Sequence, residues 1–260
     1  MTEHIKIIKV GGNIINSPAA LQAFLKEFAA LEGKKILVHG GGALATELAG
    51  RLGITQQMID GRRVTDAETL KIVTMVYAGY VNKQVVSGLQ SYGCNAIGIC
   101  GADGHIITAR RRTFPADFGF AGDIDRVDTD ALSALLLHFD TVVVAPLTMD
   151  VSGQLLNTNA DTIARSVAAA LSAAAPCELI YTFEKNGVLQ DVEQPDSVIP
   201  LLTAAHYQQL REEQRIFAGM LPKLDNAFLA LREDVGSVYI GPADQLKALS
   251  EGRCGTKIIL

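Results

Sequence analysis

The sequence predicts an α/β fold, a three-layer αβα sandwich with an open, mainly parallel central sheet. Three observations predict it. Strand-like and helix-like segments alternate along the chain, as in βα units. The strand-like segments are continuously apolar, as expected for strands buried on both faces. Two early strands run into glycine-rich turns that open helices. With 48% hydrophobic and 20% charged residues, the 260-residue chain has enough apolar material for one large domain or two joined lobes.

The expected strands are short apolar runs, several of them β-branched, bounded by glycine, proline or polar residues. The first, residues 5–10, ends at Gly11-Gly12, and the second, residues 35–39, ends at Gly40-Gly41-Gly42. Five more follow, at residues 96–100, 141–146, 178–182, 237–240 and 257–260. Because these segments alternate with helices, we expect most of them to pair in parallel.

The expected helices are placed by capping signals and by apolar residues at helical spacing. Ser17 before Pro18 predicts an N-cap and a first helical residue, and Thr65 with Glu68 matches a capping box. In chain order the helices are predicted at residues 18–28, 43–52, 65–92, 128–138, 161–174, 203–211, 223–231 and 243–249.

Two segments bear on the organisation of the chain. Residues 108–125 are polar, contain glycine and lack periodicity, so we expect a β-hairpin or a lid inserted in the sheet. Residues 173–176 are the best place for a boundary between an N-terminal lobe (1–175) and a C-terminal lobe (176–260).

Composition and missing motifs exclude several classes. A net charge of −5 argues against a general nucleic-acid binder, and no run of 18 uncharged apolar residues predicts a membrane span. The four cysteines are scattered without a CxxC pattern, which favours reduced thiols in a cytoplasmic protein. The sequence has no HExxH metal motif, no GxSxG elbow and no GxxxxGK[ST] phosphate loop. We therefore expect no metal centre built from protein ligands.

The two glycine-rich turns are the first candidate site. Ligands of open α/β sheets bind outside the carboxyl ends of strands, and consecutive backbone N–H groups there can hold anions. Lys9, two residues before Gly11-Gly12, would add a compact positive charge for a phosphate. The plainer interpretation is that each glycine pair only makes a tight βα turn.

A rival interpretation comes from the same region. Gly40, Gly42 and Ala45 fit the GxGxxA dinucleotide fingerprint after a strand, and Asp60 lies twenty residues on. This pattern indicates an NAD-dependent oxidoreductase, although Asp60-Gly61 is typical of a turn and not of a strand end.

Three further segments precede predicted helices. In Asn157–Asp161, two amides and a carboxylate could face a ligand, or Asp161 could simply cap the helix. Lys223 opposes the dipole of its own helix, so an anion such as Asp161 or a phosphate should balance it. Arg62-Arg63 suits a substrate carboxylate, or forms a solvated basic turn.

Taken together, these segments resemble the amino-acid kinase family. The matching pieces lie in register over nearly the whole chain, at residues 8–13 (IKVGGN), 38–42 (VHGGG), 61–65 (GRRVT), 81–83 (VNK), 101–104 (GADG), 157–161 (NTNAD), 219–223 (GMLPK) and 255–258 (GTKI). The resemblance implies an N-terminal part that binds an acylated amino acid and dimerises, and a C-terminal part that binds ATP.

The resemblance implies phosphorylation of the side-chain carboxylate of N-acetyl-L-glutamate, a step of arginine biosynthesis, with ATP and Mg²⁺ as cofactors. Lys9 and Lys223 would flank the transferred phosphoryl group, and Asp161 would orient both. The expected acylglutamate site is Gly41, Gly42, Arg63, Asn157 and Asn159. The expected ATP site is Gly11, Gly12, Thr182, Glu184, Gly187, Leu189, Gly219 and Met220.

Departures from the family pattern leave other outcomes open. The nucleotide loop at residues 182–188 is one residue longer than usual and has no aspartate, so either Glu184 replaces the missing acid or the purine loop is rebuilt. The altered loop also leaves open a catalytically inactive binding protein on the same fold. Thr148 and Asp60 replace the usual Gly and Asn, which suggests a longer acyl group such as succinyl. Since the first strand starts near residue 5, we expect no hexamer-forming N-terminal helix and a homodimer that arginine does not inhibit by that route.

Overall fold

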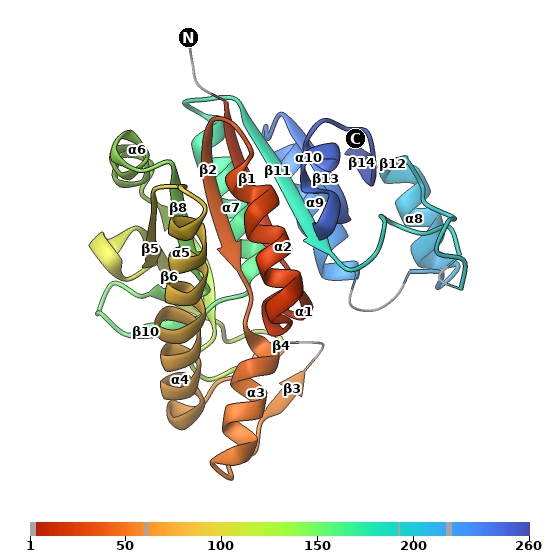
Figure 1. Cartoon of the computed structure of the whole chain (residues 1–260). Coiled ribbons are helices and arrows are strands. Elements are labelled where there is room, and N and C mark those ends of the chain that lie inside the picture. The colour runs from red at the N-terminus through yellow and green to blue at the C-terminus, as the bar shows by residue number, and fades with distance from the viewer. Residues whose placement is uncertain (1–3, 60–61, 192, 217–219) are drawn as a thin grey trace.

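The structure, a computed structural model, describes residues 4–59, 62–191, 193–216 and 220–260. Within them a central sheet is built from β1 (Ile5–Val10), β2 (Lys34–His39), β5 (Ala96–Cys100), β8 (Thr141–Ala145), β11 (Cys177–Phe183), β12 (Leu201–Thr203), β13 (Ser237–Pro242) and β14 (Thr256–Ile259). The strand order is β12-β14-β13-β11-β1-β2-β8-β5, and only β13 and β14 pair antiparallel. The predicted three-layer αβα fold with a mainly parallel sheet is confirmed (Figure 1).

Helices cover both faces of this sheet (Figure 1). One layer contains α1 (Gly12–Asn16), α2 (Pro18–Ala29), α3 (Gly42–Arg51), α4 (Ala67–Val73), η1 (Thr74–Val81), α5 (Asn82–Ser91), η3 (Ala243–Gln245) and α10 (Leu246–Ser250). The opposite layer contains α6 (Thr129–His138), α7 (Ala160–Ser172), α8 (Ala204–Glu212) and α9 (Leu221–Arg232). A short turn, η2 (Asp103–His105), follows β5.

Each central strand supplies both hydrophobic cores, because successive side chains of a strand point to opposite faces. On β1, Ile7 packs under α7 and Ile8 packs under α2, and both are fully buried. The predicted stripe of α2 is buried in this second core, and Ser17 caps the helix by accepting from the Ala20 N–H. Continuous apolar strands therefore follow from burial on both sides.

Two smaller sheets lie beside the central one. β6 (Ile107–Arg111), β7 (Gly122–Val127), β9 (Leu147–Met149) and β10 (Leu155–Asn157) form one in the order β10-β9-β6-β7. β3 (Gln57–Ile59) and β4 (Arg62–Val64) form a hairpin that was not expected. The predicted hairpin at residues 108–125 exists as β6 and β7, but its insertion in the central sheet was wrong. Its half-exposed, polar strands suit an antiparallel sheet with one solvated face.

Two predicted helix starts need correction. Asp66, not Thr65, caps α4, since its carboxylate accepts from the Thr69 N–H at 2.7 Å. The capping box was therefore wrong, and Thr65 is free for another contact. At α7 the N-cap is Asn159, whose side chain accepts from the Thr162 N–H at 3.1 Å. Asp161 is thus not the cap, and its carboxylate is available elsewhere.

The proposed lobe boundary falls between α7 and β11. Because β11 pairs with β1, the central sheet continues across it, and the division into 1–175 and 176–260 stays a prediction. The helices in the described parts of the chain are all too short or too polar to cross a bilayer. All four cysteines carry free thiols.

Candidate active site

Three charged side chains from distant parts of the chain meet at the carboxyl edge of the central sheet. Lys9 comes from the end of β1, Asp161 from the first turn of α7 and Lys223 from the first turn of α9. The Asp161 carboxylate lies 2.9 Å from the Lys9 ammonium through Oδ1 and 3.2 Å from the Lys223 ammonium through Oδ2. Asp161 thus bridges the two lysines, and the anion expected beside Lys223 is this carboxylate.

The bridge is buried, so its charges depend on one another. Burial lowers the pKa of Lys9, an effect that Asp161 opposes and Lys223 reinforces. Burial alone would raise the pKa of Asp161, but the two lysine charges hold it below the ordinary value. Asp161 is therefore ionised at neutral pH, and one carboxylate balances two cations. The surplus positive charge can attract an anionic ligand.

Hydrogen bonds from β11 fix the backbone of two members of the bridge. The Tyr181 hydroxyl donates to the Asp161 carbonyl at 3.0 Å, and the Thr182 hydroxyl donates to the Lys9 carbonyl at 3.1 Å. Both donors are completely buried. Thr182 was expected to bind ATP, but it lies behind Lys9 and outside the cavity wall.

A cavity of about 710 Å³, called the larger cavity below, has both lysines in its wall. Its lining includes most of the expected ATP-site residues, namely Gly11, Gly12, Glu184, Gly187, Leu189 and Met220. Gly219 lies outside the described residues. Sequence reasoning missed Lys185 and Arg215, which also line this cavity. These two give no local signal, because surface lysines and arginines are common.

The smaller cavity, of about 210 Å³, contains the whole expected acylglutamate set in its wall: Gly41, Gly42, Arg63, Asn157 and Asn159. Arg63 donates through Nη2 to the Gly42 carbonyl and to the Thr46 hydroxyl, each at 3.0 Å. Its buried Nη1 has no partner among the described residues. The guanidinium is thus oriented by one nitrogen and retains donors on the other for a carboxylate.

Asn157 is held in this wall by Thr65. The Asn157 amide nitrogen donates to the Thr65 hydroxyl at 3.0 Å. Thr65 is available for this contact because Asp66, and not Thr65, caps α4. Gly119 pairs with Thr65 at φ +67, and a Cβ at Gly119 would lie 2.2 Å from the Thr65 carbonyl oxygen. Only glycine fits this close approach.

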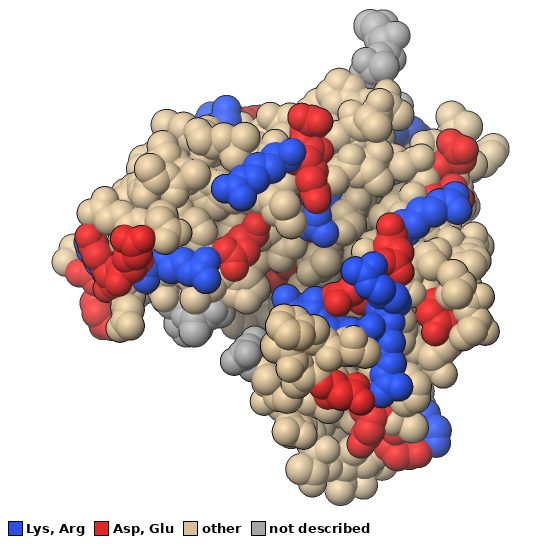
Figure 2. Space-filling model, turned by 180° about the vertical axis from the view of Figure 1, so that it is seen from behind, with Lys and Arg blue, Asp and Glu red and all other residues tan. Residues whose placement is uncertain are grey.

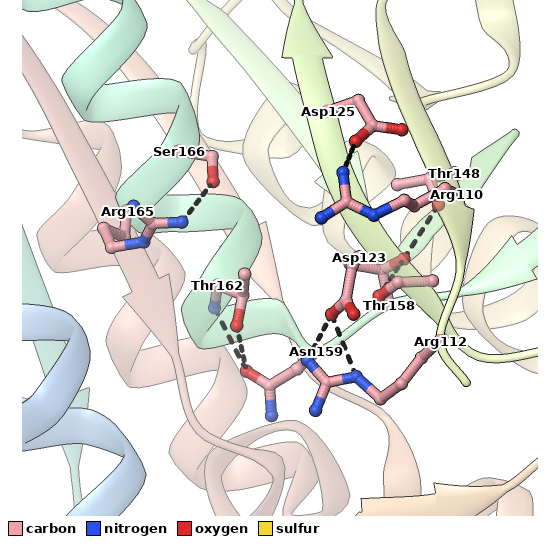
Figure 3. Close-up of polar contacts among 11 residues, drawn as sticks. Arg110, Arg112, Asp123, Asp125, Thr148, Thr158, Asn159, Thr162, Arg165 and Ser166 are labelled. Atoms are coloured by element: carbon pink, nitrogen blue, oxygen red, sulfur yellow. Dashed lines mark hydrogen bonds and ion pairs between the residues drawn. The ribbon is translucent and has the colours of Figure 1, made fainter. Parts of the chain in front are cut away.

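Sequence reasoning missed Met58, Tyr77, Arg112 and Phe118 in the same wall. Arg112 pairs with Asp123 of β7, with 2.9 Å between its Nε and the carboxylate (Figure 3). Its guanidinium also lies over the Phe118 ring, 5.9 Å from the ring centre. The only sequence signal was the basic run that ends at Arg112, and that run does not say which member faces a cavity.

Thr148 does not line the smaller cavity. It is completely buried, and its hydroxyl meets the Thr158 hydroxyl at 2.8 Å (Figure 3). Thr148 therefore gives no support to the suggestion of an enlarged acyl pocket, and Asp60 lies outside the described residues.

A buried polar network holds the glycine turn of this cavity. Burial lowers the pKa of His39 to about 4, so its ring is neutral. The ring donates from Nδ1 to the Gly40 carbonyl at 2.7 Å and accepts at Nε2 from the Asn82 amide at 3.4 Å. Asn82 also donates to the Val143 carbonyl at 3.1 Å. The turn is thereby tied to β8 and α5.

The two cavities adjoin at their glycine turns. A Cβ at Gly40, in the wall of the smaller cavity, would lie 3.4 Å from the backbone nitrogen of Gly12, in the wall of the larger one. The ligands of the two cavities would therefore meet close to Lys9. Over the face seen in Figure 2, acidic and basic side chains are interspersed, unlike the continuous basic surface typical of nucleic-acid binding.

A family model described as "Amino acid kinase family" matches residues 4–242. The chain belongs to the amino-acid kinase family. It is 51% identical over 261 residues to the acetylglutamate kinase of Cytophaga hutchinsonii, covering 99% of both proteins. This membership accounts for the kinase-like arrangement of cavities, and the oxidoreductase interpretation of the Gly40–Ala45 pattern is not favoured.

Solved structures agree with this membership. The crystal structure of smu.665 from Streptococcus mutans has a TM-score of 0.82 at 26% identity, with 98% of each chain covered. Carbamate kinase from Giardia lamblia, bound to AMP-PNP, has a TM-score of 0.71 with 99% and 98% covered. At 13% identity that second likeness shows the fold alone.

Proposed function

We propose that this protein is an acetylglutamate kinase, which transfers the γ-phosphoryl group of ATP to the side-chain carboxylate of N-acetyl-L-glutamate. One observation carries the proposal: Lys9 and Lys223 meet on Asp161 beside the point where two cavities adjoin. Full-length identity of 51% to a protein named acetylglutamate kinase supports the choice of acceptor.

The chemistry suits these residues. A carboxylate acceptor is already ionised at neutral pH, so no general base is needed. A carboxylate oxygen forms a bond to the γ-phosphorus while the bond to the bridging oxygen of ADP breaks, and charge spreads over the transferred group. Lys9 and Lys223 stabilise that charge, and Asp161 keeps both ammonium groups in place. Alignment and charge stabilisation then supply most of the catalysis.

Each cavity takes one substrate. The larger one holds ATP, with its phosphates near Lys9, Lys223 and the Gly11-Gly12 turn. The smaller one holds the acylglutamate, with its α-carboxylate on the free donors of Arg63 and its amide near Asn157 and Asn159. Glu184 lies in the wall of the larger cavity, where it takes the place of the acid that the family loop usually carries.

Three finer points belong to the same proposal. Mg²⁺ would be bound together with the nucleotide and would supply positive charge for its phosphates. The protein acts as a homodimer. Its free thiols suit the reducing cytoplasm, where arginine biosynthesis would take place.

The test is substrate-dependent release of ADP. Purified protein with MgATP should release ADP only when N-acetyl-L-glutamate is present, and hydroxylamine should trap the acyl phosphate product as a hydroxamate. Tight binding of N-acetylglutamate without ADP release would instead support an inactive binding protein. Gel filtration with light scattering at micromolar concentration checks the dimer, and a hexamer would contradict it.

A further inference from the structure

Three guanidinium groups line the smaller cavity, which is more positive charge than N-acetylglutamate requires. Arg62 and Arg63 come from β4, and Arg112 follows β6. N-acetyl-L-glutamate carries two carboxylates. In the proposed function, Arg63 binds the α-carboxylate and the side-chain carboxylate faces Lys9 and Lys223. Both anionic groups of that substrate are then matched without Arg62 or Arg112.

Arg112 has an ion-pair partner within the protein. Asp123 accepts from the Arg112 Nε at 2.9 Å, and the ring of Phe118 lies beneath the guanidinium. This pair keeps Arg112 in one orientation at the cavity wall (Figure 3). Asp123 accepts from Nε and Nη2, so the Nη1 donors of Arg112 make no hydrogen bond to a described residue.

Arg62 differs from Arg112. Its side chain makes no hydrogen bond or ion pair with any described residue, although it is half-buried in the cavity wall. Burial lowers the pKa of Arg62, and the neighbouring Arg112 lowers it further, while Asp123 opposes the change. The guanidinium stays charged, so a half-buried cation stands next to another one. A negatively charged ligand group beside Arg62 would offset the repulsion between the Arg62 and Arg112 guanidinium groups.

We propose that Arg62, beside Arg112, forms a subsite for a third carboxylate at the end of the acyl group. The preferred substrate would be an N-acylglutamate with an acidic acyl arm, such as N-succinyl-L-glutamate. This inference rests on the proposed function of the same site. Met58 and Phe118 line the cavity too, and they provide apolar surface for the methylene groups between the amide and the terminal carboxylate.

The first experiment compares three substrates on the wild-type enzyme by kcat/KM. N-succinyl-L-glutamate carries the third carboxylate, N-butanoyl-L-glutamate has the same chain length without it, and N-acetyl-L-glutamate is the reference. A charge-assisted hydrogen bond typically contributes a factor of about 10 to 100. We expect the succinyl substrate to exceed the butanoyl substrate by about that factor.

The second experiment assigns the effect to Arg62. In Arg62→Gln the ratio of succinyl to butanoyl kcat/KM should fall about 10- to 100-fold. Arg110→Gln is the matched control, since Arg110 is an exposed arginine of the neighbouring β6 that pairs with Asp125 outside the cavity. The control should keep the wild-type ratio.

The outcomes separate this inference from the proposed function. Turnover of N-acetylglutamate with no advantage of succinyl over butanoyl overturns the third-carboxylate subsite and leaves the kinase intact. A succinyl advantage that persists in Arg62→Gln overturns the role of Arg62. Absence of ADP release with all three substrates refutes the proposed function itself.

Discussion

Replacing Lys9 with methionine tests the proposed chemistry most directly. The change keeps most of the side-chain length and removes the ammonium group. A unit charge about 4 Å from a phosphoryl oxygen contributes roughly 4 kcal/mol at an effective dielectric constant of about 20. Loss of one preorganised donor lowers a rate by about 10²–10³. We therefore expect kcat of Lys9→Met to fall at least about 100-fold.

The fold should survive this change. Asp161 keeps Lys223 as an ion-pair partner at 3.2 Å, so its carboxylate is not left alone in the interior. Breaking a buried ion pair completely costs about 3–5 kcal/mol, and the cost here should be smaller. The methionine side chain fills the nearly dry site, where Lys9 is 6% exposed.

The assay is the hydroxamate trap, with kcat and both KM values measured by varying each substrate while the other is saturating. Circular dichroism melting shows whether the variant is folded. Lys71→Met is the matched control, because Lys71 lies on the exposed surface of α4 and, among the described residues, forms an ion pair only with Glu68. If folded Lys9→Met turned over within about threefold of wild type, a factor well inside the loss expected for one donor, Lys9 would not act on the transferred group.

Three further predictions concern the bridge, a buried acid and a glycine. Asp161→Asn leaves two unbalanced ammonium groups, so the free energy of unfolding, measured in urea, should fall by about 3–5 kcal/mol. MgATP should partly restore it. An equal loss with and without MgATP would contradict this. Burial raises the pKa of Glu178 to about 7 from its usual 4.5, so the folded protein loses stability as the pH rises through that interval. Glu178→Gln should therefore raise the free energy of unfolding by up to about 3 kcal/mol at pH 8 but not at pH 4. Gly119→Ala should raise KM for the acylglutamate, because its Cβ displaces Thr65 and with it Asn157; an unchanged KM would show that this contact is dispensable.

The sequence allowed the central fold to be predicted because burial on both faces leaves a strong local pattern. The strand at residues 5–10 and the stripe of α2 were found from apolar spacing alone, and Ser17 was correctly identified as a cap. Thr65 and Asp66 are both good capping residues and adjacent, so local preference could not decide between them. Tertiary contacts decided it, because Asn157 binds the Thr65 hydroxyl.

The candidate site was only partly predictable, for a similar reason. The glycine turns and Lys9 lie at strand ends, where general rules place ligands. Arg112 reaches the smaller cavity only through the pairing of β6 with β7, which no local pattern specifies. Thr148 was selected as a departure from the family pattern, but its position behind the cavity was not visible in the sequence.

The order of strands explains why Lys9 lies close to the place where the two cavities adjoin. β1 lies between β2 and β11. The chain runs from β1 to β2 on one side and from β11 to β12, β13 and β14 on the other, which makes the adjacent carboxyl ends of β1 and β11 a topological switch point. The glycine turn after β2 opens the smaller cavity on one side, and the loop after β11 opens the larger one on the other. Lys9, the penultimate residue of β1, therefore lines the larger cavity near the edge where that cavity adjoins the smaller one. In the proposed reaction the phosphoryl group would pass the end of β1, where the Lys9 ammonium stabilises its charge.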